Sequence, residues 1–99
     1  MIRIEIIANQ SVHEEIIKNL EAVIPDFCYS TIPLVYGRGK NSRKLGTTTW
    51  PETNFILLAY CADSVEQDIQ TVIEYEKKKF PDEGIKIFVM HEKNPELTN

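Results

Sequence analysis

The residues best suited to chemistry lie in one basic, glycine-containing segment, residues 37–51. It holds two glycines and four cations, which are Gly37, Gly39, Arg38, Lys40, Arg43 and Lys44. The glycines permit backbone conformations in which N–H groups converge on an anion, and Arg38 and Lys40 can pair with its charge. Arg38 is the stronger candidate because it lies nearest the preceding strand-like segment and can fork onto phosphate. We expect residues 37–40 to bind an anionic ligand; the alternative is a solvated hairpin with flexible cations.

The distribution of charge along the chain supports a binding role for this segment. No acid occurs between Asp26 and Glu52, so residues 27–51 carry four cations unopposed. The rest of the chain carries seven cations against 15 acids, and the formal net charge is −4. An acidic protein with one local positive surface favours a specific anionic partner. It does not favour nucleic acid, because phosphate backbones require a broad basic face.

The composition bounds the class of protein. The 99 residues suffice for one domain, expected over residues 1–92, with a flexible tail at 93–99. The longest apolar run, residues 55–62, is too short to cross a bilayer. The chain begins with alternating apolar residues typical of a strand and not of a signal peptide, and its two cysteines are expected to be reduced and buried. These features predict a cytoplasmic protein that is not itself a membrane protein.

Four strand-like and two helix-like segments must position the basic segment. Strands are expected at residues 1–6, 27–36, 54–61 and 85–90, and helices are expected to begin near residues 11 and 64. Pro33 removes a ladder donor, which indicates an edge strand or a bulge. Residues 54–61 are apolar on both faces, which indicates a central strand.

Both helices have an expected beginning and an expected solvated end. Capping boxes are predicted for Ser11 with Glu14 and for Ser64 with Gln67. A run of charges closes the second helix and is expected to be solvated; its members are Glu74, Glu76, Lys77, Lys78 and Lys79.

The order βαββαβ predicts an α+β, ferredoxin-like fold, with a four-stranded antiparallel sheet and two helices on one face. The uncovered face would still carry isoleucine, leucine, phenylalanine and tyrosine side chains. Such a face is too apolar for water, so we expect a homo-oligomer.

Two short motifs, together with this order, resemble the P-II signal-transduction proteins. Residues 35–40, Val-Tyr-Gly-Arg-Gly-Lys, resemble the start of the long T-loop of that family. Residues 82–89, Asp-Glu-Gly-Ile-Lys-Ile-Phe-Val, resemble the end of its B-loop and the fourth strand. The remaining glycines of the family's B-loop have no counterpart, because Lys79 and Phe80 lead directly to Pro81.

The resemblance implies a homotrimeric regulatory protein that is not an enzyme. It implies an adenine nucleotide bound in clefts between subunits, with Lys86 aimed at phosphate across the cleft. For Lys86 the alternative is a lysine on the solvent-facing side of the pleat. It also implies that residues 37–51 contact a target protein or membrane transporter, and the candidates for that contact are Arg43, Lys44 and Trp50. Trp50 can anchor a partner or stack on a base, or it can dock the loop as a hydrophobic plug.

Two rival functions remain open. The same fold and size occur in divalent-cation tolerance proteins, for which His91 or Cys61 would be ligands, although no spacing of histidines and cysteines demands a metal site. Exposed histidines are the expected alternative. The other rival is an adaptor that binds one protein and no small molecule. Catalysis is not expected, because the sequence shows no nucleophile beside a base and no paired carboxylates at useful spacing.

Overall fold

The computed structural model describes residues 1–35, 37–38, 43–44 and 53–93. The main elements are β1 (Ile2–Asn9), α1 (His13–Val23), β2 (Ser30–Val35), β5 (Asn54–Cys61), α2 (Glu66–Lys79) and β6 (Lys86–His91). Two short strands, β3 (Gly37–Arg38) and β4 (Arg43–Lys44), lie between β2 and β5. The expected βαββαβ order is confirmed, with this small hairpin inserted at its midpoint. The predicted tail at 93–99 lies outside the described residues except for Lys93.

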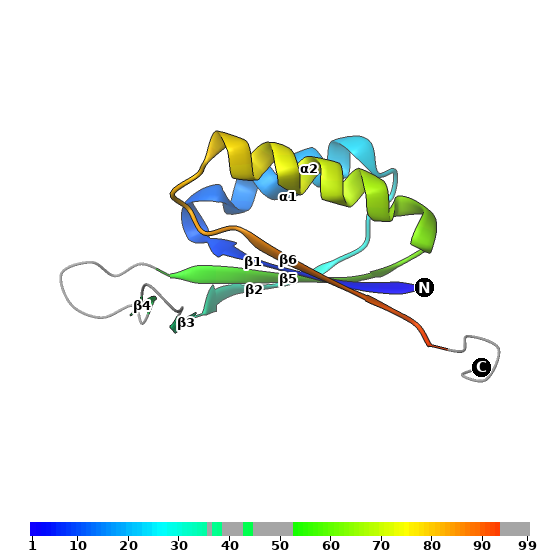
Figure 1. The fold of residues 1–99 in the computed structure, drawn as a ribbon, viewed down its shortest axis with the longest axis horizontal. Helices are drawn as coiled ribbons and strands as arrows, with labels where there is room; N and C mark the ends of the chain where they lie inside the picture. Colours follow the sequence, from blue (N-terminus) through cyan, green and yellow to red (C-terminus); the bar gives the residue numbers. More distant parts are fainter. Residues whose placement is uncertain (36, 39–42, 45–52, 94–99) are drawn as a thin grey trace.

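The four main strands form one antiparallel sheet in the order β2-β5-β1-β6, and both helices cover one of its faces (Figure 1). On β1 the side chains of Ile2, Ile4 and Ile6 point to the helices and are almost fully buried. Their neighbours on β5 and both helices complete the core, notably Phe55 and Leu20. Each fully buried aliphatic side chain contributes about 1.5–3 kcal/mol of transfer free energy, so this face of the sheet holds the fold together.

Both expectations about Pro33 are confirmed. β2 is an edge strand, where a proline is tolerated because one side of the strand has no partner. The register between β2 and β5 also shifts between Ile32 and Val35, which flank the proline. The central position of β5 is confirmed as well, and its bounds are those expected.

The two helix beginnings differ from the sequence expectation. A short 3₁₀ turn, Gln10–Val12, precedes α1, and its cap is Asn9, whose Oδ1 accepts a hydrogen bond of 2.9 Å from Ser11 N. The Ser11 hydroxyl donates instead to Glu83. A second 3₁₀ turn, Asp63–Val65, precedes α2 and has no side-chain cap. Neither predicted capping box forms, because each 3₁₀ turn moves the first orphan N–H groups toward the N-terminus.

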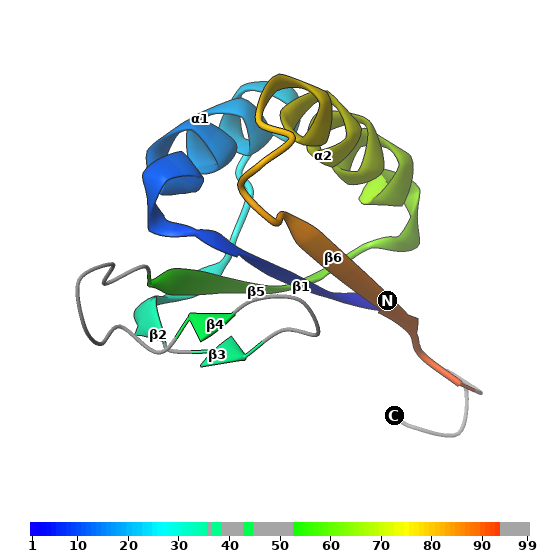
Figure 2. The same ribbon diagram turned by 60° about the vertical axis from the view of Figure 1, so that its left-hand side comes forward.

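The face of the sheet away from the helices is apolar and open. Residues paired directly across strands share a face, so the partners of Ile7, Glu5 and Arg3 lie on this side. Its exposed apolar members include Ile32, Tyr60, Phe88 and Met90. Figure 2 shows that no helix lies against this face. The apolar face predicted from the sequence is therefore present.

Candidate functional site

The β3–β4 hairpin gathers the backbone of four candidate binding residues. Gly37 pairs with Lys44 and Arg38 pairs with Arg43, so three cations lie on two adjacent rungs. The hairpin lies beyond the end of β2, on the side of the sheet away from the helices (Figures 1 and 2). Gly39, Lys40 and Trp50 lie outside the described residues, and their proposed roles stay predictions.

Lys86 lies at the same end of the sheet as the hairpin but on the opposite edge. It is the first residue of β6 and pairs with Ile7, which pairs in turn with Ile56 on β5. Its side chain is exposed on the open face. Three inter-strand spacings, about 14 Å, separate β6 from β2. Within one chain Lys86 is therefore a solvent-facing lysine, and the fold does not bring it to the base of the hairpin.

A polar layer closes the same end of the sheet. The backbone N–H of Gln10 donates to the carbonyl of Thr53 at 3.0 Å, which ties β1 to the return of the basic segment. Ser11 donates to Glu83 at 3.1 Å and so joins the first helical turn to the approach to β6. Thr53, which follows the basic segment, and Glu83, which precedes Lys86, are thus both bound to the residues that follow β1.

His13 also belongs to this layer. The prediction that its side chain is exposed is wrong. The ring is half-buried and packs against Phe55, with the centroids 4.3 Å apart and the planes tilted by 31°. Its Nε2 is buried without a hydrogen-bond partner among the described residues. The one signal in the sequence was its position one residue after Val12, at the start of the apolar stripe of α1.

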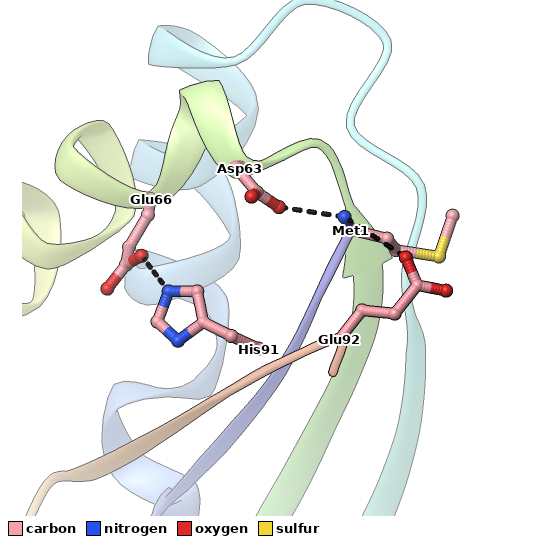
Figure 3. A network of polar contacts seen from close by, with 5 residues as sticks. All are labelled: Met1, Asp63, Glu66, His91 and Glu92. Carbon is pink, nitrogen blue, oxygen red and sulfur yellow. Dashed lines mark hydrogen bonds and ion pairs between the residues drawn. The ribbon is translucent and has the colours of Figure 1, made fainter. Parts of the chain in front are cut away.

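A separate polar network lies at the opposite end of the sheet (Figure 3). His91 Nε2 lies 2.7 Å from Glu66 Oε1, which links the end of β6 to the start of α2. The Met1 ammonium lies 2.8 Å from Asp63 Oδ1 and 3.7 Å from Glu92 Oε1. The hydrogen bond between Met1 and Asp63 raises the pKa of the ammonium and lowers the pKa of the carboxyl. These contacts fasten the ends of three elements together.

Of the two residues of the metal hypothesis, His91 belongs to this network and Cys61 lies beside it. Cys61 and His91 both pair with Ile2, one from each neighbouring strand. Because Ile2 faces the helices, both residues lie on the helix side of the sheet. Burial raises the pKa of the Cys61 thiol, which works against its use as a thiolate ligand. Within the described ranges no cluster of three or more histidine, cysteine, aspartate or glutamate side chains could hold a metal ion.

The two cysteines differ in their surroundings. Both are free thiols, but Cys28 is exposed and Cys61 is half-buried, so the expectation that both are buried is wrong for Cys28. None of the helices that the structure describes is long and apolar enough to span a membrane.

Comparison with known proteins identifies the fold. No family model matches the sequence, and no curated protein matches it either. Among solved structures, CPII from Thiomonas intermedia K12, bound to ADP and bicarbonate, aligns with a TM-score of 0.70 at 14% identity, covering 90% of this chain and 82% of CPII. CPII bound to ADP, AMP and bicarbonate, where it is described as a nitrogen regulatory PII-like protein, aligns at 0.68 and 15% identity with the same coverage.

Two further solved structures share the fold at similarly low or lower sequence identity. A protein from Thermus thermophilus, described as PII-like and signaling, aligns at a TM-score of 0.62 with 17% identity, covering 90% of this chain and 83% of that one. The de novo designed protein Foldit4 aligns at 0.52 with 9% identity, covering 93% and 98%. At such identities a shared fold carries no function by itself. The predicted resemblance is confirmed for architecture: the chain has the ferredoxin-like fold of the PII-like proteins.

Proposed function

We propose that this protein is a cytoplasmic PII-like regulator that acts as a homotrimer. A small anionic effector of the adenine-nucleotide type binds in the clefts between subunits. Binding of this effector shifts the loop at residues 37–51 between ordered and disordered states. The loop then engages a target protein or a membrane transporter. The protein performs no catalysis of its own.

The observation that carries the proposal is the separation of Arg38 and Lys86. Lys86 begins the edge strand β6, whereas Arg38 follows the opposite edge strand, β2, in the hairpin beyond its end. Within one chain the fold does not bring Lys86 to the base of the hairpin, whereas adjacent subunits can bring Lys86 of one to the hairpin of the other. The exposed apolar side chains of the open face supply a reason for the chains to associate.

The residue types fit an anion with more than one negative oxygen. Arg38 offers a planar fork for phosphate, and Lys86 and Lys40 offer point charges. Gly37 and Gly39 let backbone N–H groups approach the same anion closely. Arg43, Lys44 and Trp50 then remain for the target protein.

The solved PII-like structures guide the choice of ligand to test. CPII has been observed with ADP and bicarbonate, and also with ADP, AMP and bicarbonate. ADP and AMP, alone and with bicarbonate, are therefore the first ligands to test here, followed by ATP and cyclic AMP.

Isothermal titration of the full chain with these ligands tests the proposal. We expect Arg38→Ala and Lys86→Ala each to weaken nucleotide binding at least about tenfold, or about 1.4 kcal/mol. The control is Lys78→Ala, which removes the same charge from an exposed position on α2.

The outcomes separate the parts of the proposal. Equal losses for all three variants would indicate a general charge effect and would remove both residues from the site. No heat with any of these ligands would contradict the nucleotide-binding function.

A further inference from the structure

Glu76 is a buried acid in the middle of the helical layer. The sequence predicted a solvated residue, and that prediction is wrong, because the side chain is fully buried. It continues the buried stripe of α2 formed by Ile69, Val72 and Ile73. An isolated carboxylate in such a place is strongly disfavoured, so its charge must be removed or compensated.

The contacts of Glu76 come from α1. Asn19 Nδ2 donates to Glu76 Oε1 at 2.5 Å. The carboxyl group of Glu15 lies within hydrogen-bonding reach of that of Glu76. Glu15 Oε1 accepts in turn from Lys79 Nζ at 3.0 Å. The two glutamates therefore form a carboxyl pair between the helices, a pair that the sequence reading did not foresee because its members are 61 positions apart.

The pair has one unmet requirement. Glu15 Oε2 and Glu76 Oε2 are both buried, and neither has a hydrogen-bond partner among the residues that the structure describes. Two carboxylate oxygens cannot bond to each other, but one proton between them turns one oxygen into a donor. The contacts then form an unbroken chain in which Asn19 donates to Glu76, Glu76 donates to Glu15, and Lys79 donates to Glu15.

We propose that Glu15 and Glu76 share one proton across the α1–α2 interface, and that loss of this proton above neutral pH loosens the packing of the two helices. The helical layer is thereby sensitive to pH, independently of any ligand bound at the end of the sheet.

The surroundings place the proton on Glu76. Burial, and then the hydrogen bond with Glu15, raises the pKa of Glu76 to about 7. The hydrogen bond with Glu76, and then that with Lys79, lowers the pKa of Glu15. Lys18 from α1 also favours the charged form of Glu15.

No other described charge faces the pair from the sheet, because the buried side chains that β1 and β5 direct at the helices are apolar. These side chains are Ile2, Ile4, Ile6, Ala8, Phe55, Leu57 and Ala59. A groove of about 690 Å³ between the helices is lined by Glu15, Asn19 and Lys79, among others, so the pair is open to solvent on the side of Glu15.

The direction of the pH dependence follows from the raised pKa. Between the ordinary pKa of 4.5 and about 7, folded Glu76 keeps a proton that the unfolded chain has lost. The free energy of unfolding therefore falls as pH rises through this window and levels off above it.

The variant Glu76→Gln reproduces the protonated state. Its amide oxygen can accept from Asn19 and its amide nitrogen can donate to Glu15, at nearly the same volume. The control is Glu74→Gln, which removes the same charge from an exposed position two residues away on α2. Urea unfolding of both variants and the natural chain, from about pH 5 to about pH 8.5, compares their stabilities.

We expect the natural chain and Glu74→Gln to lose stability in parallel as pH rises. Glu76→Gln should show a flatter profile and be the most stable of the three at the alkaline end. The difference between the profiles of Glu76→Gln and Glu74→Gln is the readout. If Glu76→Gln keeps the pH dependence of the natural chain, the proposal fails.

A second measurement needs no variant to fold. In a carbon NMR titration of the glutamate carboxyls, one resonance of the natural chain should have a midpoint near 7, and amides at the α1–α2 contact should exchange faster above that pH than their intrinsic rates explain. Midpoints below about 5.5 for every glutamate would overturn the proposal.

Discussion

Gly84 turns the chain between α2 and β6 with a φ of +59°, in the left-handed region that side chains disfavour. It is the single glycine of residues 82–89, the segment that resembles the end of the B-loop. A Cβ added at this position would meet no atom within 4 Å, so any cost of substitution arises from the backbone alone. Gly84→Ala should lower the free energy of unfolding by about 1 kcal/mol, and Gly84→Asn by less, because asparagine tolerates this conformation better. Urea denaturation measures both, and equal stability of the alanine variant and the natural chain would contradict the expectation.

The burial of single charged or polar residues was the least predictable property at this scale. Glu76 lies in a run of charges, which normally indicates a solvated helix end, and nothing near it in sequence reveals Asn19 and Glu15 on the other helix. His13 likewise needs Phe55, a residue of a distant strand, to explain its half-buried ring. Both depend on tertiary partners that periodicity along one helix cannot identify.

Among the elements, the beginning of α1 offers a direct test of which residue caps it. Asn9 is nearly buried and accepts from Ser11 N, whereas Ser11 is exposed and bonds to Glu83. Asn9→Ala should therefore lower the free energy of unfolding by about 1 kcal/mol, and Ser11→Ala by less. Glu14→Gln should leave stability nearly unchanged, because Glu14 is exposed and does not close a capping box. Thermal unfolding of the three variants measures this order, and a larger loss for Ser11→Ala than for Asn9→Ala would restore the sequence-based assignment.

The strands were more predictable than the helix beginnings. The bounds of β5 follow from an apolar run on both faces, which only a central strand buries. β2 begins later than expected, since Phe27 and Tyr29 stack on each other at 5.4 Å before the strand starts. The apolar residues of the sequence did not distinguish the segment before β2 from the strand itself.

The candidate ligand site belongs to the scale of the whole molecule, and for that reason the sequence suggests candidate residues for it but not their arrangement. Arg38 and Lys86 follow from glycine, charge and motif patterns. Lys86 lies on one edge strand and Arg38 follows the other edge strand, and this arrangement depends on the strand order β2-β5-β1-β6. Whether they meet depends on contacts between chains, which no pattern within one chain specifies.

The assembly can be tested with a pair of matched tyrosines. Tyr60 is 63% exposed on the open face of the sheet, and Tyr75 is 54% exposed on α2. If the open face joins the subunits, Tyr60→Lys places a charge in a buried contact and should weaken each interface by about 2 kcal/mol. Light scattering should then show a shift from three chain masses toward one, while Tyr75→Lys stays trimeric. A natural chain that scatters as a monomer at micromolar concentration would remove the trimer, and with it the means of bringing Lys86 to the hairpin of its neighbour.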